Sequence, residues 1–88
     1  MTTHGGMLTV RLVLFAQYRE LLGDRERSVE VSEGTTPRAL LARLSAGNSR
    51  LEALQAVVRF LVNSEFVSGE EPLQEGDELA FVPPVAGG

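Results

Sequence analysis

Two apolar segments, one near each end of the chain, place the tightest constraint on the fold. Residues 8–15 begin with alternating apolar and polar side chains and then become continuously apolar, and residues 79–82 are apolar throughout. Runs of this kind are typical of strands that are covered on both faces. We therefore expect both segments to be interior strands of one sheet, with the C-terminal tail at an edge or an end of that sheet.

Between these segments the sequence predicts one main helix. Thr36 is a favoured N-cap residue and Pro37 suits the first helical position, so the helix should span residues 37–45. Its apolar stripe would consist of Leu40, Leu41 and Leu44. The other predicted elements are a short helix at residues 16–22, a weaker one at 50–56, and strands at 27–31, 57–63 and 66–67. One main helix on one face of a small mixed sheet is an α+β arrangement.

The length of the chain limits it to one domain, because 88 residues allow a single small core. We expect residues 1–6 to be a disordered leader, 7–84 the folded domain and 85–88 an extended tail. The first residues contain no basic region followed by an apolar stretch, and no apolar run approaches the roughly 18–20 residues of a membrane span. We therefore expect a cytoplasmic protein that has no membrane partner.

The distribution of charge bears on the partners of the chain. The net charge of −4 argues against nucleic acid, because phosphate contacts need a basic surface. Residues 1–59 contain eight Arg and six acidic residues, whereas residues 60–88 contain acidic residues and no base. The acidic residues of the second segment are Glu65, Glu70, Glu71, Glu75, Asp77 and Glu78. They form either a solvated acidic loop or a face that steers the chain toward a basic partner surface.

Few side chains could support catalysis. The chain has no Cys and no Lys, which excludes disulfides, thiolate metal sites and Schiff-base chemistry on its own side chains. His4, the only His, lies in the expected leader, so we predict neither a Ser-His-Asp triad nor a metal site. We also predict no bound cofactor. The chain alone is therefore a poor enzyme.

The remaining candidate for chemistry is the C-terminal tail, Pro-Pro-Val-Ala-Gly-Gly, which Gly87 and Gly88 make thin and flexible. Residues 84–88 reach about 17 Å when they are fully extended at roughly 3.4 Å per residue. Such a tail can enter a narrow channel of a partner and deliver the α-carboxyl group of Gly88. That group can be activated by adenylation and then attacked by sulfur, since no Cβ crowds its carbonyl carbon. The alternative is an ordinary chain end that has no function.

Two segments resemble a known family, the small subunits of molybdopterin synthase. Residues 14–23, Leu-Phe-Ala-Gln-Tyr-Arg-Glu-Leu-Leu-Gly, are similar to its opening signature. Residues 73–88 are similar to its closing pattern almost throughout, and the Pro-Pro-Val-x-Gly-Gly end is the most specific part. Asn63 also falls where the family often has Asn. The resemblance spans residues 8–88, with looser matches at 47–56 and 64–71.

This resemblance implies a ubiquitin-like β-grasp fold and a role as a sulfur carrier in molybdenum cofactor biosynthesis. An E1-like adenylyltransferase would adenylate Gly88 with ATP, and a sulfur donor, a sulfurtransferase or cysteine desulfurase, would supply the sulfur of a thiocarboxylate. The sulfur would then pass to a cyclic pterin precursor in a large catalytic subunit. The implied assembly is a heterotetramer of two small and two large subunits.

The resemblance also suggests roles for individual residues. It assigns the sulfur to Gly88 and a channel-fitting role to Gly87. The residues that would line the channel entry are Pro84, Val85 and Ala86. Phe81 and Phe15 are further predicted contacts with the partner, although an aromatic side chain is more often a core residue.

Three other functions remain open at this point. The chain could carry sulfur for thiamine or another sulfur-containing metabolite, although the thiamine carriers usually lack the Pro-Pro pair. It could be a ubiquitin-like modifier that is joined to lysines of other proteins, and without Lys it could not form chains on itself. It could also be a plain binding module with an incidental tail.

Overall fold

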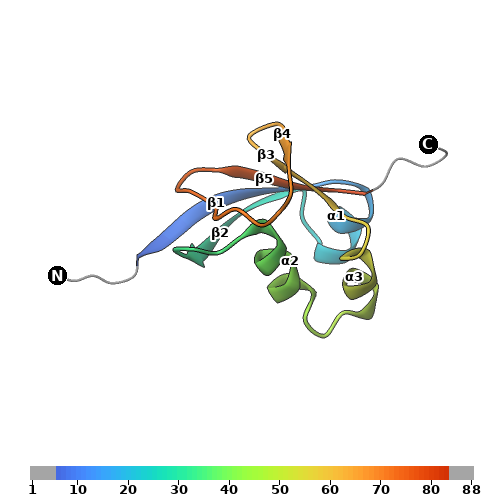
Figure 1. Ribbon diagram of the computed structural model, residues 1–88. Helices are drawn as coiled ribbons and strands as arrows, with labels where there is room; N and C mark the ends of the chain where they lie inside the picture. Colours follow the sequence, from blue (N-terminus) through green and yellow to red (C-terminus); the bar gives the residue numbers. More distant parts are fainter. Residues whose placement is uncertain (1–5, 84–88) are drawn as a thin grey trace.

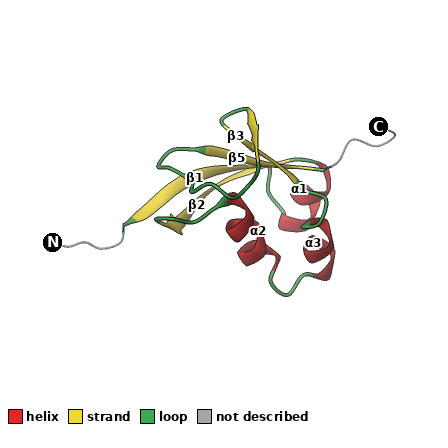
Figure 2. Ribbon diagram, in the orientation of Figure 1, coloured by secondary structure: helices red, strands yellow, loops and turns green. Residues whose placement is uncertain are grey.

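The computed structural model describes residues 6–83 and has a mixed sheet with helices on one side of it (Figures 1 and 2). In chain order the elements are β1 (Met7–Leu14), α1 (Ala16–Leu22), β2 (Glu26–Ser32), α2 (Pro37–Ser45), α3 (Ser49–Leu54), β3 (Arg59–Val62), β4 (Glu65–Val67) and β5 (Glu78–Val82). The predicted α+β class is confirmed. No helix within residues 6–83 is long and apolar enough to cross a membrane.

The strand order explains why the two apolar segments are so rich in hydrophobic residues. The order is β2-β1-β5-β3-β4, so β1 and β5 each have a neighbour on both sides. These two strands run parallel to each other, whereas β2 pairs with β1, and β3 with β5 and β4, in antiparallel fashion. The prediction that both segments are interior strands is confirmed. A parallel pair requires a crossover connection, and here the connection contains the three helices.

The core lies between the sheet and the helices, and alternate strand residues point into it. The buried residues of the strands on this side are Val10, Leu12, Leu14, Val29, Val31, Phe60, Leu79 and Phe81. Leu40 and Leu41 of α2 are fully buried against them and Leu44 is partly buried, as the predicted stripe requires. The other side of the sheet carries no helix (Figure 1).

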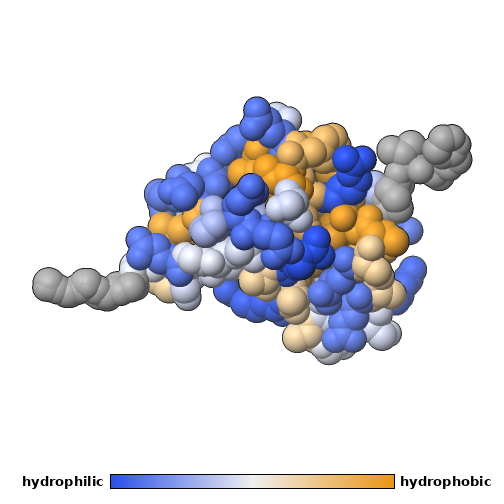
Figure 3. Space-filling view, in the orientation of Figure 1, coloured by the Kyte–Doolittle hydropathy of each residue, from blue (hydrophilic) through white to orange (hydrophobic). Residues whose placement is uncertain are grey.

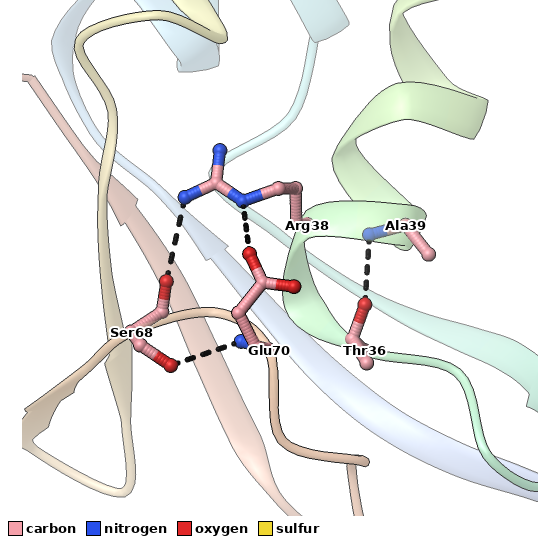
Figure 4. Close-up of polar contacts among 5 residues, drawn as sticks. All are labelled: Thr36, Arg38, Ala39, Ser68 and Glu70. Atoms are coloured by element: carbon pink, nitrogen blue, oxygen red, sulfur yellow. Dashed lines mark hydrogen bonds and ion pairs between the residues drawn. The ribbon is translucent and has the colours of Figure 1, made fainter.

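Local side-chain contacts fix where α2 begins. The Thr36 hydroxyl accepts a hydrogen bond from the Ala39 amide (3.1 Å), which confirms the predicted N-cap. Arg38, the second residue of α2, donates through Nε to Glu70 at 2.8 Å and through Nη2 to the Ser68 carbonyl oxygen at 3.4 Å (Figure 4). These contacts hold the loop between β4 and β5 against the start of α2.

The predicted third strand is too long at both ends. It was expected over residues 57–63, but β3 comprises only Arg59–Val62. It pairs with residues 79–82 of β5, and the chain before Arg59 has no partner strand among the described residues. Asn63 has a φ of 51° and belongs to the turn that follows. The weaker helix predicted at 50–56 is α3, which Asn48 caps through bonds to the Arg50 and Leu51 amides.

Candidate functional site

The C-terminal tail follows directly from the central strand β5. Five predicted site residues lie outside the described part of the chain, so their roles stay predictions: Pro84, Val85, Ala86, Gly87 and Gly88. The expected leader also lies outside it except for Gly6, whose carbonyl oxygen accepts a hydrogen bond from the Glu33 amide (3.1 Å). What the structure shows of the site is therefore the surface around the end of β5.

Phe81 does not belong to that surface. Its side chain is fully buried, 5.7 Å from the Tyr18 ring and 5.9 Å from the Phe60 ring, measured between centroids. It occupies the inner side of β5 because it lies two residues after Leu79 and so points to the same side of the strand, where it pairs in register with the buried Leu14. The prediction that the side chain of Phe81 contacts a partner is wrong. Phe81 instead anchors the end of β5 in the core.

Phe15, the other predicted aromatic contact, lies at the surface. It follows β1 directly and is the N-cap residue of α1, with φ −118° and ψ 153°. Ala16 has a φ of 47°, a left-handed conformation that turns the chain from the strand into the helix. The Phe15 side chain is 46% exposed and is thus available to a partner, whereas Tyr18 of the same helix is buried. The predicted partner contact of Phe15 stays a prediction.

The side of the sheet that faces away from the helices carries an apolar surface. Val13 of β1, Ala80 of β5 and Leu61 of β3 are neighbours in register there, and Phe66 of β4 pairs with Leu61. We call these residues together with Phe15 the open-face patch. All of them except Phe66 line a shallow hollow of about 150 Å³, together with Ser64 and Glu78. Figure 3 shows apolar surface over the strands and near the end of β5.

The turn between β3 and β4 forms one rim of this hollow. Asn63 and Ser64 have φ values of 51° and 72°, the pattern of a two-residue hairpin turn. The Asn63 side chain donates to Asp77 at 2.9 Å and accepts from the Glu78 amide at 3.0 Å. These bonds tie the turn to the start of β5, so that the rim has a fixed shape.

Two arginines on the outward side of the sheet have different contacts. Arg11 of β1 and Glu26 of β2 form an ion pair at 2.7 Å. Close to the end of β5, Arg59 pairs in register with Val82 and its guanidinium carbon lies 4.3 Å from the centre of the Phe66 ring. Within residues 6–83, no group of three His or acidic side chains could hold a metal ion.

The sequence did not single out Leu61, Phe66 or Arg59. Their positions follow from the alternation of the strands, since residues 59 and 61 point away from the core residue Phe60. A signal for Leu61 and Arg59 was thus present in the chain. For Phe66 there was none, because a three-residue edge strand is too short to show a period.

A helix-covered mixed sheet in which the first and last strands are parallel and central defines a ubiquitin-like β-grasp protein. The model of the ThiS family matches residues 12–88. The chain is also 37% identical to the molybdopterin synthase sulfur carrier subunit of Escherichia coli, over 90% of this chain and 99% of that protein. The chain therefore belongs to the ThiS family, in agreement with the resemblance to molybdopterin synthase small subunits.

Solved structures agree with this assignment. The crystal structure of small archaeal modifier protein 1 from Haloferax volcanii is 30% identical, has a TM-score of 0.72, and the match covers 89% of this chain and 99% of that one. Subunit 1 in the complex of subunits 1 and 2 of the molybdopterin-converting factor of Helicobacter pylori supports the fold alone. There the TM-score is 0.63 at 21% identity, and the match covers 92% of this chain and all of the other.

Proposed function

We propose that the chain is the sulfur carrier subunit of molybdopterin synthase and acts in the cytoplasm, with Gly88 as the residue that carries sulfur. The observation that supports this most is the position of β5. This strand directly precedes the six residues of the tail in the sequence, is held on both sides in the sheet and ends beside an uncovered apolar surface. The open-face patch can hold a partner while the tail reaches into it.

The proposed chemistry takes place on the α-carboxyl group of Gly88. Its carboxylate attacks the α-phosphorus of ATP on an E1-like adenylyltransferase, and pyrophosphate leaves. The outer sulfur of a persulfide on the donor protein then attacks the carbonyl carbon of the acyl-adenylate, and AMP leaves, which gives an acyl disulfide. A thiol then attacks the donor's sulfur in this disulfide, so that the thiol is oxidised to a disulfide with the donor and the thiocarboxylate leaves. In the large subunit the sulfur passes to the pterin precursor, and water hydrolyses the acyl group so that Gly88 returns to a carboxylate. The carrier supplies the reacting group and the other proteins supply the catalytic sites.

The proposed partner surface is the open-face patch. Phe66 and Phe15 are 56% and 46% exposed, and burial of such side chains in an interface is favourable by roughly 25 cal/mol for each Å² of apolar area. A complex of subunits 1 and 2 is known for the molybdopterin-converting factor of Helicobacter pylori. We propose the corresponding large subunit as the partner of this chain, in a heterotetramer of two small and two large subunits.

Intact mass tests the chemistry. The chain is incubated with its adenylyltransferase, ATP and a sulfur donor, and a gain of about 16 Da marks the replacement of one oxygen by sulfur. A variant that lacks Gly88 is the control, because it still ends in glycine, at Gly87, but its tail is one residue shorter. An unchanged mass for the intact chain, together with full synthase activity of the shortened variant, would refute the proposal.

A substitution at Phe15 tests the docking surface without weakening the fold. Phe15→Ser removes the exposed ring but places a favoured residue at the N-cap of α1, so the helix should remain as stable. We expect binding to the large subunit to weaken by roughly 10-fold, since the buried part of one aromatic ring is lost. Val57→Ser is the matched control, because Val57 is 47% exposed but lies outside the patch. Equal weakening by both variants would contradict this role of the patch.

A second candidate function is protein modification, which the similarity to small archaeal modifier protein 1 favours. In that case the activated Gly88 would form an amide with a lysine of a target. The last Arg of the chain is Arg59 and there is no Lys, so trypsin would leave residues 60–88 on the modified lysine rather than a short remnant. A search of trypsin-digested cell extracts for lysines that carry residues 60–88 of this chain detects or excludes conjugation.

A carrier for thiamine would instead pass its sulfur to a thiazole precursor. Offering the thiocarboxylated chain this precursor and the pterin precursor, each with its own synthase, and measuring which one receives sulfur distinguishes the two carriers.

A further inference from the structure

Arg59 has an unusual environment on the outward side of the sheet. It lies opposite Val82, the last residue of β5, and it is exposed. Its guanidinium carbon is 4.3 Å from the centre of the Phe66 ring, which is within the range of a cation–π interaction. Arg59 is therefore a positive charge that is held at the border of the open-face patch, close to the base of the tail.

No carboxylate within residues 6–83 forms an ion pair with Arg59. Three of the eight arginines have such partners at 2.7–2.8 Å, Arg11 with Glu26, Arg27 with Asp24, and Arg38 with Glu70, and Arg59 is the one of the remaining five that lies against the ring of Phe66. The acidic residue among those lining the hollow is Glu78, which pairs with Arg11 in the strand register. The charge of Arg59 is thus stabilised by an aromatic ring and remains available to a group outside the chain.

We propose that Arg59 binds a carboxylate of the large subunit and thereby sets the orientation in which the tail enters it. This inference rests on the proposed function. A guanidinium that stacks on a ring keeps its N–H groups free in its own plane, where they match the two oxygens of a carboxylate. The stacking also orders the side chain before binding, so that less conformational entropy is lost in the complex.

The charge of the whole chain makes this contact selective. With a net charge of −4, the chain as a whole repels an acidic partner group. A carboxylate can be accommodated next to Arg59, whereas the same group beside Glu78 or Glu26 would meet a like charge. A single acidic residue on the partner would therefore favour one orientation of the complex and disfavour others.

The test measures the dissociation constant of the complex with the large subunit at low and high salt, about 50 and about 500 mM. Arg59→Gln should weaken binding by about 10-fold or more at low salt and by less at high salt. Arg59→Lys keeps the charge but loses the planar double contact, and it should weaken binding by a smaller factor. The matched control is Arg50→Gln, which removes the same charge from the exposed part of α3, on the helix side of the sheet.

Phe66→Leu provides an independent check on the role of stacking. This substitution keeps an apolar side chain in the patch but removes the ring. In the Phe66→Leu background, Arg59→Gln should cause a smaller loss of affinity for the large subunit than it does in the wild type. A double-mutant cycle measures this difference. Equal affinity and equal salt dependence of Arg59→Gln and the wild type would overturn the inference and leave the proposed function intact. Failure of the wild-type chain to bind the large subunit would refute the proposed function, and the inference with it.

Discussion

Gly69 occupies a position where a side chain has no room. Its φ is 93°, and a Cβ atom built on it would lie 2.5 Å from Cδ2 and Cε2 of the Phe60 ring. That ring cannot move easily, because it packs edge-on against Phe81 at 5.9 Å and Arg38 lies 5.1 Å above it. We predict that Gly69→Ala destabilises the fold for two separable reasons, backbone conformation and steric overlap.

The two contributions can be estimated separately. An L-residue in a left-handed conformation costs about 1–2 kcal/mol. Overpacking of a fixed core costs a further 1–3 kcal/mol or so, which gives a total of about 2–5 kcal/mol for Gly69→Ala. Gly34 has the same φ of 93°, but a Cβ there would have nothing within 4 Å. Gly34→Ala should therefore cost only the backbone contribution of about 1–2 kcal/mol.

Urea unfolding of the two variants and the wild type measures the difference. We expect the midpoint for Gly69→Ala to fall below that for Gly34→Ala, with an unchanged slope, because the surface exposed on unfolding stays the same. In thermal unfolding the extra loss corresponds to a further decrease of at least about 4 °C for a domain of this size. Equal midpoints for the two variants would refute the argument that the Phe60 ring is rigidly packed.

Three other predictions concern Tyr18 and the acidic segment. Tyr18 is buried and its hydroxyl has no hydrogen-bond partner within residues 6–83, so Tyr18→Phe should leave stability unchanged or raise it by about 1 kcal/mol in urea unfolding. Burial raises the pKa of the Tyr18 hydroxyl above its ordinary value of 10.0, so the unfolded chain loses this proton first and stability should fall as pH rises above about 10. Tyr18→Phe should remove that fall, which is clearly visible because the chain has no other Tyr, no Lys and no Cys. If the acidic segment steers association, Glu65→Gln with Glu71→Gln should slow binding to the large subunit at low salt more than at high salt in stopped-flow measurements, and equal rates would count against steering.

The choice of these two glutamates depends on the structure. Asp77 looked equally suitable in the sequence, but its carboxylate accepts hydrogen bonds from Asn63 at 2.9 Å and from the Gln74 amide at 2.8 Å. A substitution there would loosen the rim of the hollow as well as remove a charge. Glu65 and Glu71 form no side-chain hydrogen bond or ion pair among the described residues, so their neutralisation changes the charge alone.

The sequence predicted the centre of the sheet better than its borders. The apolar runs at residues 8–15 and 79–82 identified the two interior strands, although helices cover only one face of the sheet and the expected burial of both faces is not found along β1. The same continuity concealed which residues point inward. Phe81 therefore looked as available to a partner as Phe15, although it lies on the same side of β5 as Leu79 and so belongs to the core.

Contacts between distant segments were beyond prediction. Arg38 and Glu70 are 32 positions apart, and their hydrogen bond depends on how the β4–β5 loop crosses the start of α2 (Figure 4). The β-branched pair at residues 57–58 suggested an earlier start for the third strand. That strand begins only at Arg59, where β5 offers a partner in Val82. Strand limits are set by the partner strand, which local sequence does not contain.

The position of β5 in the sheet has a consequence for how a small carrier can work. A tail that enters a narrow channel transmits force to the residues that precede it, so these residues must resist local opening. An edge strand could separate by breaking one set of hydrogen bonds, whereas β5 is bonded to β1 and β3 and is anchored by Phe81 in the core. Its release requires the opening of most of the sheet, which costs nearly the full free energy of unfolding. The end of β5 therefore holds a fixed position beside the open-face patch. In the proposed complex, binding of the sheet to the partner would fix the point from which the tail extends and so limit where Gly88 can lie.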